Sequence, residues 1–242
     1  MLLIRSLIFD TLFLSLMAVM GILCLPLALY SRGGTYWTIR TFCRISLWLL
    51  RVICGLRSEV RGPVPTGDVM IGSKHQSFLD ILIHCAHMHR PRFIMKRELR
   101  WAPILGLYAL RMGSTPVARG QKSKAMKAMV SSVDKESHTP GQLVIYPQGT
   151  RVAPGVKMPY KIGAGVLYQR RGVPCIPAAT NAGVFWARKS FHRRPGLAVV
   201  EYLPEIPPGL PLDAFMARLR DTVETASIAL EREAGFQHAD PA

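Results

Sequence analysis

The sequence predicts an α/β fold in which a mixed β-sheet is covered by helices and preceded by an N-terminal helical membrane module. Three observations predict it. Short runs rich in β-branched residues alternate with longer helical patterns over residues 69–233. An uncharged stretch of 21 residues, 11–31, precedes them. The chain has 31 Lys and Arg against 15 Asp and Glu, a net charge of +16, yet 49% of its residues are hydrophobic. That mixture favours a membrane-associated basic protein over a free nucleic-acid binder.

The uncharged stretch 11–31 is the first expected element. As a helix it would reach about 30 Å, enough to cross the hydrocarbon core of a bilayer. Because no small-residue cleavage site follows it, a membrane anchor is favoured over a cleaved signal peptide. A helical hairpin that dips into one leaflet is the alternative to a full span.

Residues 37–56 form the next expected helix, which is amphipathic. Arg40, Arg44 and Arg51 fall within about 40° of one another on a helical wheel, and the tryptophans suit the level of the lipid headgroups. The apolar side of this helix could also pack on the following domain. If 11–31 spans, the arginines mark its cytoplasmic end. This predicts a protein of the inner (cytoplasmic) membrane, with the rest of the chain on the cytoplasmic side and anionic lipids as partners.

A loop dense in Gly and Pro, residues 61–68, follows. It predicts a boundary near residue 58, between N-terminal membrane-anchoring helices (1–57) and a second domain (58–242). The strands expected in the second domain are 69–73, 92–95, 114–117, 142–146, 173–178 and 197–202, and the expected helices are 78–89, 101–111, 121–138, 160–171 and 213–233.

The five cysteines are scattered and odd in number, so they predict neither a disulfide framework nor a zinc ribbon, and a reducing compartment fits them best. Four potential ligands lie close together at His84, Cys85, His87 and His89. Because their spacing spreads the side chains around a helix end, they predict a polar helix terminus and no metal site.

His75 and Asp80 are the first candidates for catalysis. Five helical positions separate two side chains by about 140°, so these two meet only if His75 lies in the turn before a helix and Asp80 in its first turn. A carboxylate in that place fixes the tautomer of the imidazole and stabilises the imidazolium, which makes the histidine a general base. Ser77 is a weaker candidate nucleophile, because no Gly-x-Ser-x-Gly elbow is present.

A second polar stretch, Tyr146-Pro147-Gln148-Gly149-Thr150-Arg151, also follows an expected strand. Together with His75-x4-Asp80 it resembles the glycerolipid acyltransferase family, most closely the 1-acylglycerol-3-phosphate acyltransferases. Four further blocks between residues 93 and 178 carry the likeness, which covers most of residues 70–182. These blocks are 93–106 with Lys96, 113–119 with Arg119, 161–164 with Lys161, and the apolar 173–178.

The resemblance implies transfer of an acyl chain from acyl-CoA or acyl-ACP to the sn-2 hydroxyl of 1-acylglycerol-3-phosphate (lysophosphatidate), giving phosphatidate. His75 and Asp80 would act as base and orienting carboxylate, without a covalent intermediate. No cofactor beyond the acyl co-substrate and no nucleic acid is implied. The acceptor carries a phosphate, for which Arg supplies bidentate contacts and Lys a point charge. The substrate-binding residues implied are Lys96, Arg119, Gln148, Gly149, Thr150, Arg151 and Lys161.

Two positions depart from the family pattern. Lys74 stands where the family has Asn, and Gln148 stands where it has Glu. A neutral amide is neither a base nor a metal ligand, although it can hydrogen-bond a glycerol hydroxyl. Two alternatives remain open: transfer to another lysolipid, such as a lyso-ornithine lipid, and a non-catalytic basic protein that binds membrane surfaces.

Overall fold

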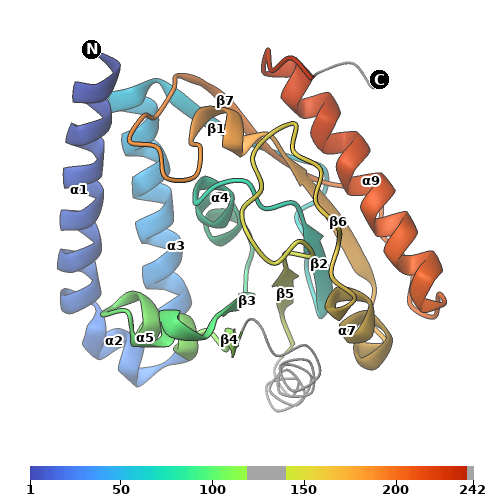
Figure 1. The fold of residues 1–242 in the computed structure, drawn as a ribbon. Helices are drawn as coiled ribbons and strands as arrows, with labels where there is room; N and C mark the ends of the chain where they lie inside the picture. Colours follow the sequence, from blue (N-terminus) through green and yellow to red (C-terminus); the bar gives the residue numbers. More distant parts are fainter. Residues whose placement is uncertain (119–139, 239–242) are drawn as a thin grey trace.

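Seven strands form one mixed sheet in the part of the chain that the structure, a computed structural model, describes, namely residues 1–118 and 140–238 (Figure 1). The strand order is β1-β7-β6-β2-β5-β3-β4, and every pairing is parallel except that of β6 with β7. The expected fold class is therefore confirmed. The strands are β1 (Leu56–Arg61), β2 (Val69–Ser73), β3 (Pro91–Lys96), β4 (Thr115–Val117), β5 (Gln142–Ile145), β6 (Cys175–Thr180) and β7 (Gly196–Tyr202).

Helices cover both faces of this sheet. Successive strand side chains point to opposite faces, so Ile71 and Val144 join one core cluster while Met70 and Leu143 join another. The first cluster includes residues of α1, α3 and α4, and the second those of α7 and α9. The helices are α1 (Leu2–Leu23), α2 (Leu25–Tyr30), α3 (Arg32–Leu49), α4 (Leu79–His87), α5 (Leu105–Arg111), α7 (Gly163–Arg171), α8 (Ala182–Phe185) and α9 (Leu212–Glu233).

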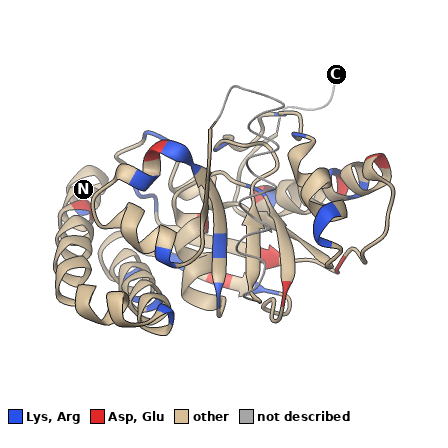
Figure 2. Cartoon of the chain, turned by 90° about the horizontal axis from the view of Figure 1, so that it is seen from below, with Lys and Arg blue, Asp and Glu red and all other residues tan. Residues whose placement is uncertain are grey.

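The N-terminal helices begin and end at other residues than expected. The expected helix 11–31 is wrong in its bounds, because α1 begins at Leu2 and ends at Leu23, and Cys24 separates it from the short α2. Asp10 lies within α1 and does not bound it. Its charge is paired, because its Oδ1 lies 2.7 Å from Arg193 Nη2 of the α/β part. Helix α1 is long and apolar enough to cross a membrane. Core helices of soluble proteins and signal sequences can have the same length and composition. Figure 2 shows few charged residues along it.

Two arginines of the expected amphipathic helix have partners within the protein. Arg40 donates to the carbonyl oxygens of Met88 and His89, and Arg44 donates to that of Ala86. They thus satisfy carbonyl groups at the C-terminal end of α4, where cations are favoured. The helix itself ends at Leu49, and a π-helical turn (η1, Leu50–Cys54) leads into β1.

Strand β1 was missed, because its sequence, Leu-Arg-Ser-Glu-Val-Arg, is mostly polar, as an edge strand can be. It spans the expected boundary at residue 58, and the division of the chain there stays a prediction. The expected helix 101–111 begins too early: a 3₁₀ helix (η2, Arg97–Trp101) ends at its first residue, and α5 begins only at Leu105. The expected helix 121–138 lies outside the described residues.

Strands β2, β5 and β6 position the site. They run in parallel, so their carboxyl ends lie at the same edge of the sheet. In sheets of this kind, ligands bind at that edge. Two loops begin there: the His75 loop (residues 74–78), between β2 and α4, and the Gln148 loop (residues 146–162), between β5 and α7.

Candidate active site

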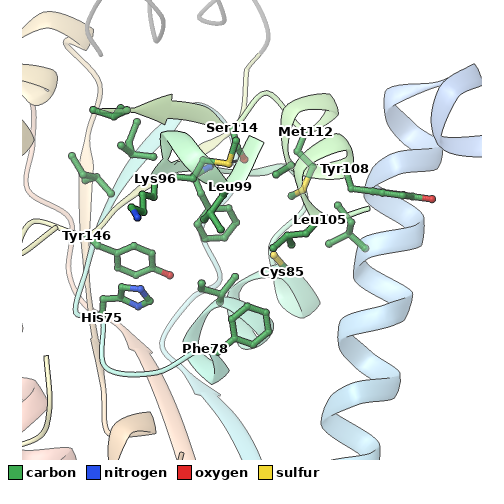
Figure 3. Close-up of a pocket in the computed structure, with 18 of the residues that line it drawn as sticks. His75, Phe78, Cys85, Lys96, Leu99, Leu105, Tyr108, Met112, Ser114 and Tyr146 are labelled. Carbon is green, nitrogen blue, oxygen red and sulfur yellow. Dashed lines mark hydrogen bonds between the residues drawn. The ribbon is translucent and has the colours of Figure 1, made fainter. Parts of the chain in front are cut away.

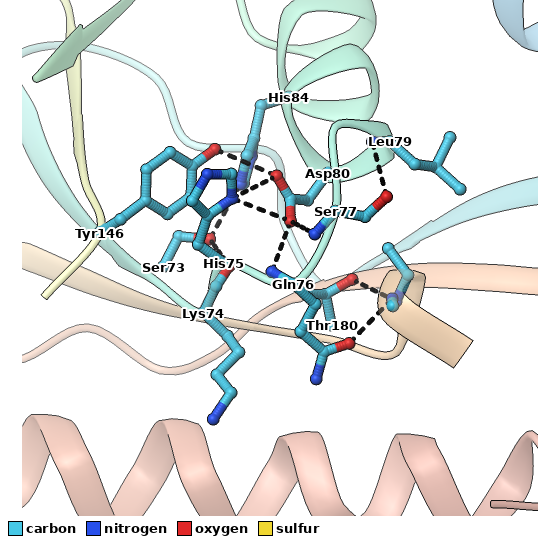
Figure 4. A network of polar contacts seen from close by, with 12 residues as sticks. Ser73, Lys74, His75, Gln76, Ser77, Leu79, Asp80, His84, Tyr146 and Thr180 are labelled. Carbon is cyan, nitrogen blue, oxygen red and sulfur yellow. Dashed lines mark hydrogen bonds and ion pairs between the residues drawn. The ribbon is translucent and has the colours of Figure 1, made fainter. Parts of the chain in front are cut away.

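His75 and Asp80 meet as the turn-and-helix argument requires (Figure 4). His75 Nδ1 lies 3.0 Å from Asp80 Oδ1 and 3.2 Å from Oδ2. The Asp80 side chain is fully buried, and its Oδ2 accepts the backbone N–H groups of Gln76 and Ser77, each at 2.9 Å. Burial alone would raise the pKa of Asp80, but the charge of His75 and these hydrogen bonds lower it below its ordinary value. The carboxylate therefore stays ionised and orients the imidazole.

Tyr146 is a third member of the group that the sequence reasoning missed. Its ring stacks on that of His75, with centroids 3.9 Å apart, and its hydroxyl donates to Asp80 Oδ1 at 3.4 Å. Burial and the Asp80 carboxylate raise the pKa of Tyr146 well above its ordinary value, so the phenol remains a donor. The available signal was its position at the end of β5, directly before Pro147.

An apolar cavity of about 790 Å³ opens beside His75 (Figure 3). Its walls come from α1, α3, α4, β3 and α5, together with the Gln148 loop. Phe78, Leu99, Leu105 and Met112 are typical lining residues. A mostly apolar cavity with a few polar groups at one place is the usual form of a small-molecule site.

Two of the four predicted cations line this cavity. Lys96 and Lys161 both line it. The side chain of Lys161 lies across Gly149, where φ is +70° and a Cβ would come within 2.7 Å of Lys161 Nζ. Arg151 is partly exposed on the Gln148 loop and is not among the lining residues. Arg119 lies outside the described residues.

The remaining predicted substrate-binding residues differ in what they contact. Thr150 Oγ1 accepts a hydrogen bond at 3.3 Å from Arg188, an exposed residue that the sequence reasoning did not select. Gln148 is 2% exposed, and its amide donates to Glu224 of α9 at 3.4 Å. The amide of Gln148 is therefore engaged by α9, and Gln148 is not among the residues that line the cavity.

One backbone contact joins the two loops of the site, and a second closes the Gln148 loop on itself. The N–H of Val152 donates to the carbonyl oxygen of His75 at 2.8 Å, and the N–H of Lys161 donates to that of Pro147 at 2.9 Å. The base and Lys161 are thus carried on loops that are tied together at the edge of a rigid sheet.

The histidine-rich end of α4 serves the fold. His84 is fully buried and bonds Tyr202 Oη at 2.8 Å and Ser73 Oγ at 3.0 Å. Burial lowers the pKa of His84 to about 4, so its imidazole is neutral. Among the described residues, no group of three or more His, Cys, Asp or Glu could hold a metal ion.

A buried His–Asp pair that faces an apolar cavity, with cations nearby, fits enzymes that transfer acyl chains to anionic acceptors. A family model described as Acyltransferase matches residues 57–181, more than half of the chain. The chain belongs to this family, and the resemblance seen in its motifs is confirmed.

Individual relatives agree with this assignment. A Pseudomonas aeruginosa protein named 1-acyl-sn-glycerol-3-phosphate acyltransferase is 29% identical over 167 residues, which span 68% of this chain and 65% of that protein. The human 1-acyl-sn-glycerol-3-phosphate acyltransferase alpha is 30% identical over 196 residues, 78% of this chain and 69% of the human one. The crystal structure of the 1-acyl-sn-glycerophosphate (LPA) acyltransferase PlsC of Thermotoga maritima matches with a TM-score of 0.79 over 95% of this chain and 96% of that chain. At 17% identity, this last likeness shows the fold alone.

Proposed function

We propose that the protein transfers an acyl chain from a thioester, acyl-CoA or acyl-ACP, to the sn-2 hydroxyl of lysophosphatidate, giving phosphatidate. One observation carries the proposal: the His75–Asp80 pair faces an apolar cavity. Its Nδ1 is engaged by Asp80, which leaves Nε2 to act as the base. The names of the relatives support this acceptor.

The chemistry needs one base and no covalent enzyme intermediate. His75 Nε2 takes the proton of the acceptor hydroxyl as its oxygen attacks the thioester carbonyl. The C–S bond then breaks, and the departing thiolate takes the proton from the imidazolium. Asp80 stabilises the imidazolium between these two steps. Ser77 does not fit as a nucleophile, because its side chain is fully buried and its Oγ accepts the N–H of Leu79 at the start of α4.

The apolar walls of the cavity and the nearby cations suit different parts of the substrates. An acyl chain fits the apolar walls contributed by α1, α3, α4 and α5, since burial of apolar surface is the main gain there. The acceptor phosphate belongs near Lys96, Lys161 and Arg151, where Lys offers a point charge and Arg a bidentate fork. Arg119 remains an expected member of this set.

The packing of α1 against the rest of the protein favours insertion into one leaflet over a full membrane span. Ser6, Phe9, Phe13 and Gly21, which mark one face of α1 along its length, are buried within the protein. A helix that left the domain to cross a bilayer would expose this face and separate Asp10 from Arg193. The outer face of α1 is apolar and exposed, as a helix in the interfacial plane requires. We place the domain on the cytoplasmic side of the inner membrane, where lysophosphatidate and acyl donors would meet it.

Thiol release by the purified full-length protein, given acyl-CoA and lysophosphatidate, tests the proposal. His75→Ala should lower the rate by roughly 10²–10⁴-fold, and Asp80→Asn should also be severe. Ser77→Ala should keep much of its activity. An acyl group trapped on Ser77, or an active His75→Ala variant, would overturn the mechanism.

The same assay separates the alternatives. Lyso-ornithine lipid and zwitterionic lysophospholipids are offered beside lysophosphatidate, and acyl-ACP beside acyl-CoA. A clear preference for an acceptor without a phosphomonoester would remove lysophosphatidate as the substrate. Absence of thiol release with every acceptor would favour a non-catalytic membrane-binding protein.

A further inference from the structure

Helix α9 presents two glutamates to the two residues that flank His75. Glu224 and Glu231 are seven positions apart, two turns of helix, and so lie on one face. Lys74 Nζ lies 2.8 and 2.7 Å from the two carboxylate oxygens of Glu224. Gln76 Nε2 donates to Glu231. The side chain of Lys74 points toward α9, on the side away from the stacked rings of His75 and Tyr146 (Figure 4).

The same two carboxylates also hold the Gln148 loop. Glu224 accepts hydrogen bonds from the amide of Gln148 at 3.4 Å and from the hydroxyl of Tyr160 at 2.9 Å. Glu231 accepts the N–H of Gly155 at 3.3 Å. Each carboxylate therefore joins three parts of the chain: α9, the His75 loop and the Gln148 loop.

The loop residues in these contacts are buried, and Lys74 forms an ion pair with Glu224, whose side chain is 28% exposed. Lys74 is 3% exposed and Gln76 1%. Charge-assisted hydrogen bonds in such surroundings are stronger than neutral ones at the surface. Pro147 and Gly149, the neighbours of Gln148, line the cavity. A shift of Gln148 would consequently move the cavity wall beside the base.

We propose that Glu224 and Glu231 are positioning residues, through which α9 holds the base and the acceptor-binding loop in one fixed relation. This inference rests on the proposed function. Helix α9 lies outside residues 57–181, which the family model matches, so these roles belong to a part of the chain that the family assignment does not cover.

The arrangement also gives a physical reason for the two departures from the family pattern. A glutamate at position 148 would place a second carboxylate against that of Glu224, and two like charges in a buried site repel. Gln148 avoids this repulsion and donates a hydrogen bond, while Lys74 neutralises Glu224. The charges and hydrogen-bonding groups of Lys74, Gln148 and Glu224 are thus complementary.

The test compares glutamates of the same helix in the full-length protein. Glu224→Gln should lower kcat by about 10- to 100-fold, the cost of a small misplacement of reacting groups, and raise KM for lysophosphatidate while KM for acyl-CoA stays unchanged. Tyr160→Phe removes one hydroxyl only and should raise KM for the acceptor with little change in Tm. The matched control is Glu233→Gln, because Glu233 pairs with Arg61 away from both loops, and it should leave both constants within about twofold of wild type.

Exchanging the carboxylate and the amide supplies a rescue. The single variant Gln148→Glu should be impaired, whereas Gln148→Glu combined with Glu224→Gln should recover most of the loss. Wild-type kcat and KM in Glu224→Gln, with a lowered Tm, would show that α9 serves stability alone and would overturn the proposal, as would a failed rescue. A wild-type protein without acyl transfer, or an active His75→Ala, would instead count against the proposed function.

Discussion

At the scale of one residue, His84 is a buried group outside the cavity that bonds the end of the strand before the His75 loop. Ser73 donates its hydroxyl to the carbonyl of Lys74, so it can only accept from His84 Nε2. Nδ1 is then the acceptor for the hydroxyl of Tyr202. One neutral tautomer therefore joins β2, α4 and β7 directly beside the His75 loop.

This neutral histidine predicts a loss of stability in mild acid. The unfolded chain protonates His84 below about pH 6.5, but the folded protein does so only near pH 4. Between these values the unfolded state holds more protons, so stability falls as the pH drops, by up to about 3 kcal/mol. Asp80, His75 and His87 are the ionisable groups that act on it. Denaturant unfolding from pH 7 to pH 4 should show a shallower decline in His84→Gln than in wild type, with His87→Gln as control. Equal slopes in all three would contradict the assignment.

Arg151 carries the prediction for the acceptor phosphate. Arg151→Lys keeps the charge but loses the planar fork, so both it and Arg151→Ala should lower kcat/KM for lysophosphatidate, Ala more than Lys. The loss should be much smaller for an acceptor without a phosphomonoester. Because Arg151 lies outside the lining residues, the headgroup would have to extend beyond the cavity to reach it. Equal losses on both acceptors would assign Arg151 to the fold or to the acyl donor.

At the scale of an element, α1 packs closely against the start of α5 at Gly21. A Cβ at Gly21 would lie 2.3 Å from Cγ2 of Ile104. Ile104 has little freedom to yield, because its own φ of 61° is rare for a β-branched residue. Tyr108 of α5 adds a hydrogen bond to the carbonyl of Gly21 at 3.1 Å. All three residues line the cavity.

We therefore expect Gly21→Ala to destabilise the protein by about 1–3 kcal/mol, the usual cost of overpacking. It should also lower kcat/KM more for long acyl donors than for short ones. Gly33→Ala is the matched control, since the atom nearest to its Cβ would be Ser31 Oγ at 3.8 Å. That change should be neutral or slightly stabilising, because Ala has the higher helix propensity. Similar unfolding midpoints for the two variants would contradict the packing argument.

The elements that the sequence predicted and those that it did not differ in a physical way. Strands β2 and β5 are buried and apolar, so local composition predicts them. Strand β1 is polar and is recognisable only through its pairing with β7. Likewise, His75 and Asp80 are neighbours in sequence, whereas Lys74 and Glu224 are 150 positions apart. Nothing local to α9 distinguishes Glu224 from the exposed Glu233 of the same helix.

At the scale of the whole molecule, exposed apolar side chains gather on the N-terminal helices and near the cavity. Ile4, Leu14 and Ile22 of α1 are 59%, 55% and 63% exposed, and Trp101 of η2 is 74% exposed. Apolar surface of this extent marks a membrane or partner contact. The cavity borders the same helices, so a lipid substrate could enter from the bilayer.

Replacing Ile4, Leu14 and Ile22 together by Gln should release the protein from membranes without unfolding it, because none of the three is buried. Flotation with liposomes that contain anionic lipid measures the release, and Tm measures the fold. The matched control changes the same positions to Val, which keeps the surface apolar and should keep binding. Unchanged flotation of the Gln variant would place membrane binding elsewhere.

The pairing of β1 with β7 has a consequence for how the protein is made. Leu56 pairs with Gly196, 140 positions later (196 − 56). At ribosomal speeds of roughly 5–20 residues per second, about 7–28 seconds separate their synthesis. During that interval Phe9 and Phe13 lack Trp186, their aromatic partner from the later chain. The N-terminal helices are thus made well before the partners that cover Phe9 and Phe13 and the strand that pairs with β1.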